Sequence, residues 1–270
     1  MKIKRKILIV GGTGFIGYHL IKHLKKKKIY SISSLSTKPP KKEKKFQNVK
    51  YLFCDIANKK NLKIKLEKNK FDFIVNLGGY VDHTNKKKTI ISHYNGCKNL
   101  VEIFSNQKIK RFIQIGSSVE YGNLPSPQKE NTKLKLKNVY SNYGKSKLRS
   151  TRLLLNYHRN FSFPAVILRL YIAFGPAQDF NRFIPIVIRN CLSDSRFPCS
   201  VGTQYRDFIY IEDLIKLIIK CLTKRNITGE IFNIGSGNPV KIKDVIKTIL
   251  RETGGGKPQF GKIKFRKDEI

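Results

Sequence analysis

Tyr143 and Lys147 are the residues whose types and spacing most suggest acid–base chemistry. They are four residues apart, so they share one face if residues 139–159 form a helix. A tyrosine with its ordinary pKa of about 10 is a weak base at neutral pH. A nearby lysine ammonium stabilises the phenolate and lowers such a pKa, which allows proton exchange with a hydroxyl group. In a chain with 42 lysines, a chance pair would be the favoured explanation of these two residues if nothing else supported catalysis.

Hydroxyl side chains at the end of a predicted strand provide that support. Residues 111–116 are predicted to form a strand, and Ser117 and Ser118 follow it. Parallel sheets bind ligands at the carboxyl ends of their strands, so a serine there can hydrogen-bond a reacting oxygen. Either serine alone would be explained by turn formation, but together with Tyr143 and Lys147 they favour catalysis.

A glycine-rich turn near the N-terminus predicts a dinucleotide site. Residues 12–17 follow a predicted strand at 6–10, have the pattern G-x-G-x-x-G, and lead into a predicted helix at 15–28. Such glycines permit a tight turn, close approach of a diphosphate and close packing of helix on strand. The amides at the helix start then hold the anion. We therefore expect dinucleotide binding rather than an ordinary turn.

The segment expected to contact the adenosine ribose contains no carboxylate. An acid is expected about 20 residues after the glycines, where it would bind the 2′-hydroxyl. Residues 30–38 hold no Asp or Glu, and Ser33, Ser34, Ser36 and Lys38 could accept a 2′-phosphate. The expected cofactor is therefore NAD or NADP, with a mild preference for NADP; Lys38 is also explained as a surface residue.

Apolar runs of strand length alternate with segments of helical period along most of the chain. Further strands are predicted at 30–35, 49–54, 73–77, 164–170 and 230–234, and further helices at 89–107, 139–159 and 208–222. This alternation predicts an α/β, Rossmann-like, doubly wound parallel sheet. We expect a dinucleotide-binding domain at 1–170 and 207–235 and a smaller substrate-binding lobe at 171–206 and 236–270. Residues 38–46 and 254–258 are expected to be loops.

The net charge of +37 raises the question of a nucleic-acid partner. The excess consists of 42 lysines against 13 arginines, and no lysine lies between Lys147 and Lys216. The sequence has no arginine-rich reading helix and no aromatic-and-basic RNA motif. We therefore interpret the lysines as solvated surface and expect no specific nucleic-acid partner.

The chain lacks the patterns of membrane and disulfide-rich proteins. No run approaches the roughly 18 apolar residues of a membrane span. The apolar run at 7–10 is too short for a secretory signal. Five scattered cysteines without a C-x-x-C pair favour neither disulfides nor a zinc site, so a cytoplasmic location and no metal are expected.

The motifs together resemble one known family, the extended short-chain dehydrogenase/reductases of the NAD-dependent epimerase/dehydratase group, which act on nucleotide sugars. The resemblance covers nearly the whole chain and follows these segments in order: 11–17, 55–56, 76–79, 117–122, 143–147, 169–176, 206–213 and 233–237. It implies that Tyr143 is the catalytic acid/base, that Lys147 lowers its pKa and binds the ribose, and that Ser117 bonds the substrate. It also implies a homodimer formed through the helices at 89–107 and 139–159.

The same resemblance assigns binding residues. The expected cofactor-binding residues are Gly11, Gly14, Phe15, Ile16, Gly17, Ser33, Asp55, Ile56, Leu77, Gly78, Gly79, Tyr143 and Lys147. The expected substrate-binding residues are Ser118, Asn181, Arg182 and Arg206, of which Arg206 would grip the diphosphate.

The sequence departs from the family pattern at several positions. Dehydratases of the family carry Asp-Glu where this chain has Ser118 and Val119, so dehydration is disfavoured. His93 and Ile172 stand where the family usually has Asn; His93 is interpreted as a packed histidine in preference to a proton donor. The chain stops within a stretch at 260–270 that relatives continue, so the resemblance implies a shortened substrate lobe.

The expected function is therefore that of an NAD(P)-dependent nucleotide-sugar epimerase or 4-ketoreductase. Hydride transfer is expected at a sugar carbon, C4 or a neighbour, of a nucleoside-diphosphate hexose, with CDP-abequose-type 4-ketoreductases as the most similar members. The sequence leaves epimerase and ketoreductase open. The alternatives are a dehydratase of the same family and a non-catalytic dinucleotide-binding sensor.

Overall fold

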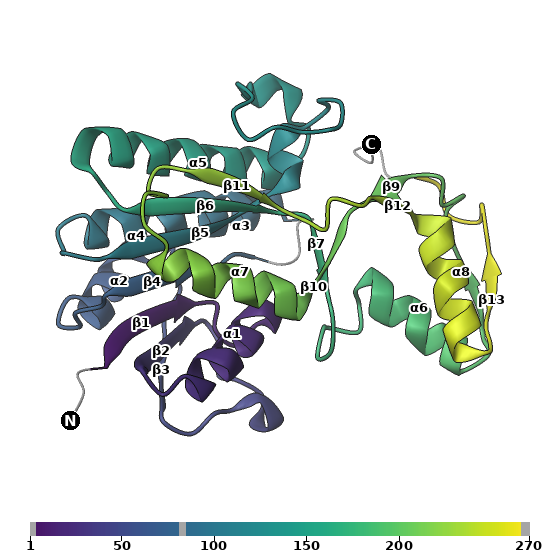
Figure 1. Ribbon diagram of the computed structural model, residues 1–270, viewed down its shortest axis with the longest axis horizontal. Helices are drawn as coiled ribbons and strands as arrows, with labels where there is room; N and C mark the ends of the chain where they lie inside the picture. The colour runs from purple at the N-terminus through teal and green to yellow at the C-terminus, as the bar shows by residue number, and fades with distance from the viewer. Residues whose placement is uncertain (1–3, 81–84, 266–270) are drawn as a thin grey trace. The chain divides into compact units, whose positions relative to one another are not determined.

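The computed structural model describes residues 4–80 and 85–265, which form two compact units (Figure 1). The first unit comprises Met1–Leu170 and Glu212–Asn233, and the second comprises Tyr171–Ile211 and Ile234–Ile270. The structure thus assigns residues 207–211 and 234–235 to the second unit, whereas the sequence-based division assigned them to the first.

A seven-stranded sheet forms the centre of the first unit, in the order β11-β6-β5-β4-β1-β2-β3. Its strands are β1 (Arg5–Val10), β2 (Tyr30–Ser36), β3 (Val49–Phe53), β4 (Phe73–Asn76), β5 (Arg111–Ser117), β6 (Ala165–Leu170) and β11 (Ile231–Ile234). Neighbouring strands from β3 to β6 pair in parallel. This order is that of a doubly wound dinucleotide-binding sheet, so the predicted α/β Rossmann-like fold is confirmed.

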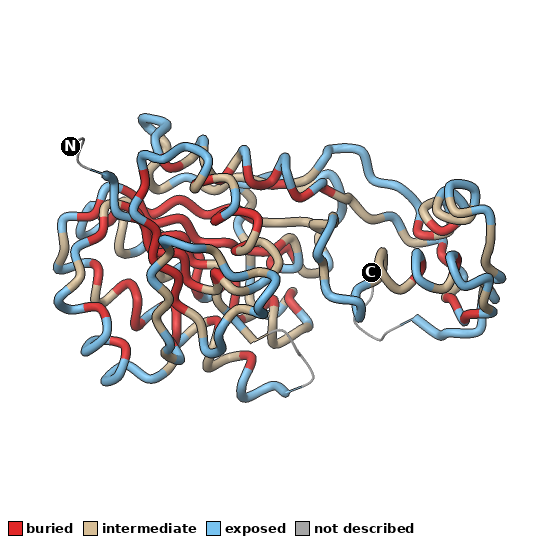
Figure 2. The backbone as a smooth tube through the Cα atoms, turned by 90° about the horizontal axis from the view of Figure 1, so that it is seen from below, coloured by how far each residue is buried: buried red, intermediate tan, exposed pale blue. Residues whose placement is uncertain are grey.

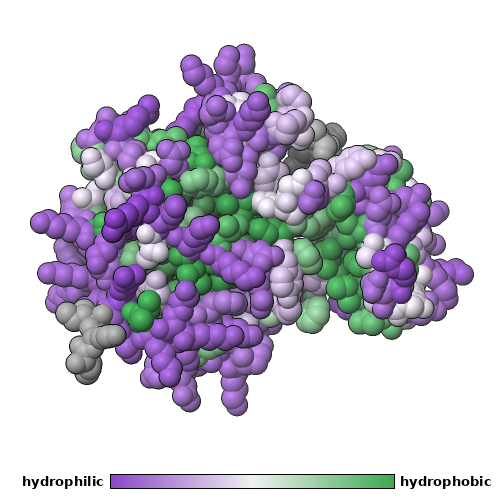
Figure 3. All heavy atoms as spheres, viewed as in Figure 1, coloured by the Kyte–Doolittle hydropathy of each residue, from purple (hydrophilic) through white to green (hydrophobic). Residues whose placement is uncertain are grey.

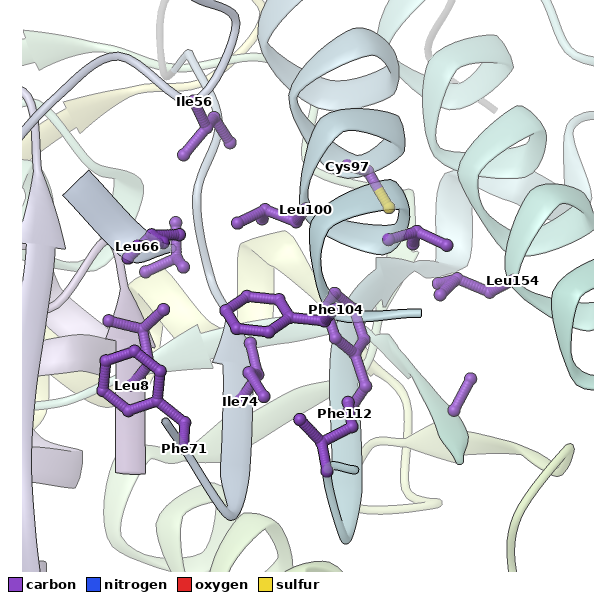
Figure 4. Packing of buried hydrophobic residues seen from close by; sticks show 14 of the residues in the cluster. Leu8, Ile56, Leu66, Phe71, Ile74, Cys97, Leu100, Phe104, Phe112 and Leu154 are labelled. Carbon is purple, nitrogen blue, oxygen red and sulfur yellow. The ribbon is translucent and has the colours of Figure 1, made fainter. Parts of the chain in front are cut away.

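Helices cover both faces of this sheet, which explains why its central strands are continuous apolar runs. One face carries α2 (Lys59–Leu66), α4 (Gly96–Phe104) and α5 (Asn142–Phe161), while α1 (Phe15–Lys26) and α7 (Ile211–Thr223) lie on the other (Figure 1). Figure 4 shows Leu66, Leu100, Phe104 and Leu154 of the first face in one cluster with Ile74 and Phe112 of the sheet. In Figure 2 the buried residues, drawn in red, gather in the centre of this sheet.

The described residues of the second unit form three short strand pairs and two helices. Its strands are β7 (Ile172–Phe174) with β10 (Phe208–Tyr210), β9 (Tyr205–Arg206) with β12 (Val240–Lys241), and β8 (Arg196–Pro198) with β13 (Lys257–Gln259). Helices α6 (Phe183–Leu192) and α8 (Ile242–Thr253) enclose a small core that includes Val187, Cys191 and Ile246.

Several sequence predictions of secondary structure were wrong in part. The helix predicted at 208–222 begins at Ile211, because residues 208–210 pair with β7; its first turn then holds Glu212 and Asp213, which suit a helix N-terminus. The loop predicted at 254–258 includes the start of β13. The helix predicted at 89–107 is interrupted: α3 (Lys86–Ile90) and α4 are joined by a π-helical turn, Ile91–Asn95.

The structure shows the state of the cysteine side chains and the character of the surface. All five cysteines are free. None of the helices in the described ranges has the length and apolar character needed to cross a membrane. Hydrophilic side chains cover much of the first unit on the face drawn in Figure 3.

Asp72 fixes the amino-terminal edge of the sheet. Its Oδ2 accepts a hydrogen bond from the Lys6 amide at 2.7 Å, and its Oδ1 pairs with Lys110 Nζ at 2.9 Å. Its own amide and carbonyl bond to Lys6 and Lys110. Burial raises the pKa of Asp72, but the bonds from Lys110 and the Lys6 amide outweigh this, so the pKa lies below its ordinary value.

Asp72→Asn is expected to lower the free energy of unfolding by about 1 kcal/mol at pH 7, because a neutral amide forms weaker bonds to these donors. The folded pKa is depressed, so this stabilisation is complete above the unfolded carboxyl's pKa of about 3.9 and is lost as the pH falls through the folded value. Urea unfolding between pH 7 and pH 3 measures the difference.

Glu252→Gln is the control, because Glu252 forms a pair with Arg251 in which both side chains are more than half exposed. Such pairs contribute little to stability. Equal effects of the two substitutions at pH 7 would contradict the role given to Asp72.

Candidate active site

The glycine turn after β1 leaves helix amides open to an anion. Gly11 has φ of +78°, and its amide donates to the Leu35 carbonyl at 2.7 Å. Gly14 then donates to Gly11 at 3.1 Å and forms the N-cap of α1. No side chain in the described part of the chain caps this helix, so its first-turn amides can bind a diphosphate.

Two other glycines of the turn allow α1 to pack closely on the sheet. A Cβ on Gly17 would overlap the backbone of Gly11 and Gly12. A Cβ on Gly12 would overlap the hydroxyl of Ser34 in β2. Any larger residue at either position would displace the start of α1 from the turn.

The carboxyl end of β2 meets this turn at Ser36. The amide of Thr13 donates to Ser36 Oγ at 3.3 Å. Ser33, the serine predicted to bind the cofactor, is 8% exposed and lies within β2 opposite Leu8 and Lys50. Ser36 is therefore better placed than Ser33 to contact a group bound at the turn, and the sequence did not distinguish the two.

Local hydrogen bonds fix the loops that follow β3 and β4. Asp55 accepts the amide of Ala57 at 2.8 Å and remains exposed, while Ile56 is buried. The Asn76 side chain accepts the amide of Gly78 at 3.0 Å. Leu77 donates to the Val10 carbonyl at 3.0 Å, which places the Leu77–Gly79 segment beside the end of β1.

Ser117 ends β5 and begins the 3-10 turn Ser118–Tyr121. Its side chain is the N-cap of this turn and accepts the Val119 amide at 3.5 Å. Ser118 is half-buried, and Val119 is 42% exposed. The hydroxyl of Ser117 thus lies at the same edge of the sheet as the glycine turn.

Lys147 joins the helix of Tyr143 to the strand of Ser117. Lys147 is 4% exposed, its Nζ donates to the Ile115 carbonyl of β5 at 2.8 Å, and it lies 5.7 Å from the centroid of the Tyr143 ring. A Cβ on Gly144 would come within 2.8 Å of the Val119 carbonyl, so α5 approaches the turn after Ser117 closely. The structure therefore brings Ser117, Tyr143 and Lys147 to one region of the first unit.

His93 is a second neighbour of Tyr143, and sequence reasoning did not anticipate this contact. It lies in the π-helical turn, is 7% exposed, and its ring meets the Tyr143 ring edge-on at 4.9 Å. His93 Nε2 is 3.1 Å from the Tyr80 carbonyl, and a Cβ on Gly79 would overlap the ring. The burial agrees with the interpretation as a packed histidine. The signal in the sequence was a histidine where the family has Asn.

The predicted substrate residues other than Ser118 lie in the second unit. Asn181 and Arg182 are exposed, and Arg182 is the N-cap of α6. Arg206 lies in β9 opposite Val240. The adjacent Asp207 accepts the amides of Ser236 and Gly237 at 2.7 and 2.9 Å, which fixes the glycine-containing loop beside Arg206.

A parallel sheet in doubly wound order, with a glycine turn at its carboxyl edge, defines the class of Rossmann-type dinucleotide-binding folds. A model of the NAD dependent epimerase/dehydratase family matches residues 7–235. The chain therefore belongs to the NAD-dependent epimerase/dehydratase family.

The relatives differ from one another in activity. The chain is 29% identical to a dTDP-D-glucose 4,6-dehydratase of Dictyostelium discoideum; the match covers 91% of this chain and 62% of that protein, less than two thirds of its length. A UDP-glucuronic acid 4-epimerase from Bacillus cereus, in complex with UDP-glucuronic acid and NAD, is 29% identical with a TM-score of 0.83, covering 95% of this chain and 86% of that one. A dTDP-glucose 4,6-dehydratase from Bacillus anthracis in complex with NAD has a TM-score of 0.86 at 22% identity, covering 98% and 86%, which shows the fold alone.

Gly17→Ala tests the glycine turn. The new methyl group would overlap the Gly11 and Gly12 backbone, so α1 must shift and its amides no longer converge on the turn. We expect the affinity for NADH or NADPH to fall about tenfold or more, or about 1.4 kcal/mol. Titration of the reduced cofactor's fluorescence measures this.

Gly254→Asn is a suitable control, because Gly254 is the left-handed C-cap of α8, nothing lies within 4 Å of the added Cβ, and Asn tolerates that conformation. Unchanged affinity in Gly17→Ala, with the control also unchanged, would show that the turn does not hold the diphosphate.

Proposed function

We propose that this chain is an NAD(P)-dependent nucleotide-sugar epimerase or 4-ketoreductase that acts at a sugar carbon, C4 or its neighbour, of a nucleoside-diphosphate hexose. The observation that supports it most is the buried ammonium of Lys147, which bonds the Ser117-bearing strand and lies against the Tyr143 ring. A general acid/base, an ammonium group and a hydroxyl group that lie together at the carboxyl edge of a parallel sheet suit proton transfer to and from an alcohol.

The residues at this edge have separate roles in the proposal. Tyr143 takes the proton of the sugar hydroxyl during oxidation and returns it during reduction. Ser117 donates a hydrogen bond to the same oxygen, and Lys147, held by the Ile115 carbonyl, orients Tyr143 and the ribose. The nicotinamide ring, when bound, supplies hydride acceptance and donation.

The described residues fit such a cofactor. The uncapped amides of α1 and the glycine turn would hold its diphosphate, and Asp55 and Ile56 would flank its adenine. The segment Leu77–Gly79 would line the nicotinamide side. The Bacillus cereus structure named above contains NAD.

Epimerisation and reduction differ in the source of the ketone. Oxidation of the sugar alcohol, with Tyr143 as the base, gives a ketosugar. If this ketosugar rotates in the site and is reduced on its other face, the product is an epimer and no cofactor is consumed. If a ketosugar enters from outside, one reduced cofactor is consumed for each sugar.

Two features speak against dehydration, the activity in the names of several relatives. The positions after Ser117 carry a hydroxyl and an isopropyl group, Ser118 and Val119, instead of carboxyls. The nearby Glu120 is fully buried and paired with Arg169 at 3.1 Å, so it does not replace them.

The residues expected to bind the nucleotide sugar are found in each of the two units. Ser118 belongs to the first unit, and Asn181, Arg182 and Arg206 to the second. Arg206 supplies the planar donor group that suits a diphosphate. A homodimer formed through α4 and α5 and a cytoplasmic location stay predictions.

Tyr143→Phe is expected to lower kcat by about 100- to 10,000-fold, the range typical of a lost general acid/base, while cofactor affinity stays within a few fold. The parent protein and the variant are incubated with UDP-, GDP-, dTDP- and CDP-hexoses and their 4-keto forms. Absorbance of the reduced cofactor and product chromatography are followed.

Stoichiometric consumption of cofactor identifies a reductase, and a new epimer without consumption identifies an epimerase. Release of a 4-keto-6-deoxy sugar would identify a dehydratase. Cofactor binding without turnover of any sugar would favour the sensor, and undiminished turnover in Tyr143→Phe would overturn the role given to Tyr143.

The preference for NADP is tested at Ser36, which meets the glycine turn through Thr13. Ser36→Asp keeps an acceptor for the Thr13 amide but adds a charge that repels a 2′-phosphate. We expect affinity for NADPH to fall about tenfold or more while affinity for NADH changes little. A parent protein that binds NADH more tightly than NADPH would contradict the preference.

A further inference from the structure

Glu120 is a fully buried carboxylate whose two oxygens are both occupied. Oε1 accepts the amide of Ser117 at 2.9 Å. Oε2 accepts the hydroxyl of Thr151 at 2.8 Å and Nε of Arg169 at 3.1 Å. The exposed fractions are 0% for Glu120, 1% for Thr151 and 2% for Arg169. Every group of this cluster therefore lies beneath the surface.

Stability alone does not account for this cluster. Removing two charges from water costs several kcal/mol for each ion, and well-packed apolar residues are often at least as stabilising as a buried ion pair. The elements that the cluster connects suggest another role. Its members come from the turn after β5, from α5 and from β6.

Thr151 connects the cluster to the helix of the proposed acid/base. It lies eight residues after Tyr143 and four after Lys147, so the three side chains share one face of α5. Glu120 therefore bonds the Ser117 backbone through one oxygen and the Tyr143 helix through the other. Gly116 allows this approach, because a Cβ there would come within 2.6 Å of Glu120 Oε1.

A second set of contacts holds the turn from its other end. The Arg169 guanidinium lies 4.6 Å from the centroid of the Tyr121 ring. The Tyr121 hydroxyl donates to Asn233 at 2.7 Å, in β11. The turn that follows Ser117 is thus fixed at both ends, and its hydroxyl N-cap has little freedom to shift.

We propose that Glu120 is a positioning residue that sets the hydroxyl of Ser117 relative to Tyr143 and Lys147, with Thr151 as its link to α5. This inference rests on the proposed function, because Ser117 and Tyr143 must act on one substrate oxygen for their relative position to matter. Displacements of the order of 1 Å in such groups reduce rates strongly.

Thr151→Val tests the link while leaving Glu120 paired with Arg169. Valine has nearly the shape of threonine but does not donate to Oε2. We expect kcat to fall about tenfold, with KM for the sugar and affinity for the cofactor unchanged. Thr151→Ser keeps the hydroxyl and is expected to restore kcat to within about twofold of the parent.

Two further variants separate positioning from a general loss of packing. Thr89→Val is the matched control, because Thr89 is also fully buried but its hydroxyl donates to the carbonyl of Asn85, the N-cap of α3. The kcat of this variant is expected to stay unchanged. If Thr151 acts through Ser117, adding Thr151→Val to Ser117→Ala lowers kcat no further than Ser117→Ala alone.

The outcomes are distinguishable. A parent protein without turnover of any nucleotide sugar overturns the proposed function and this inference with it. An active parent with an unchanged Thr151→Val variant overturns the inference alone. Additive losses with Ser117→Ala, or a loss of cofactor affinity together with kcat, would show that Thr151 is merely structural.

Discussion

The common edge at which parallel strands end is the constraint on which this structure depends. Because β1 to β6 run in one direction, the glycine turn, the Leu77–Gly79 segment and Ser117 emerge on the same side of the sheet. Helices on both faces bury the strands, which leaves this edge as the place for polar groups. Tyr143 reaches it from α5, whose position relative to β5 is fixed by Lys147 and the Ile115 carbonyl at 2.8 Å.

Lys147 and Glu120, two charged groups buried behind this edge, are both hydrogen-bonded. Lys147 bonds a backbone carbonyl, and Glu120 bonds an amide, a hydroxyl and a guanidinium. A buried network with all its members paired resists rearrangement, since breaking one bond leaves another group unpaired in a medium of low polarity. Rigidity of this kind suits groups that must meet a single substrate oxygen.

Local patterns in the sequence predicted the strands and the turn that depend on burial and backbone geometry. The apolar runs of β1, β4 and β6 and the glycine turn follow from burial and backbone geometry, and each lies within a few residues of its predicted place. The start of α7 was misplaced because residues 208–210 have helical periodicity but pair with β7. Ser33 and Ser36 belong to the same strand, and the contact of Ser36 with Thr13 follows from the fold and not from the local sequence. The contacts of His93 with Tyr143 and of Glu120 with Thr151 join residues 50 and 31 positions apart, which no spacing rule reveals.

The position of one carboxyl in the turn after Ser117 determines which groups that carboxyl can contact. A 3-10 turn has three residues per revolution, so neighbouring positions face different surroundings. Position 119 is 42% exposed at the carboxyl edge, whereas position 120 is 0% exposed and faces Arg169. A carboxyl at 119 would be able to exchange protons with a ligand, while at 120 it is committed to Ser117, Thr151 and Arg169. This chain has its acid at the second position. An acid at this position is therefore suited to holding the hydroxyl of Ser117 in place.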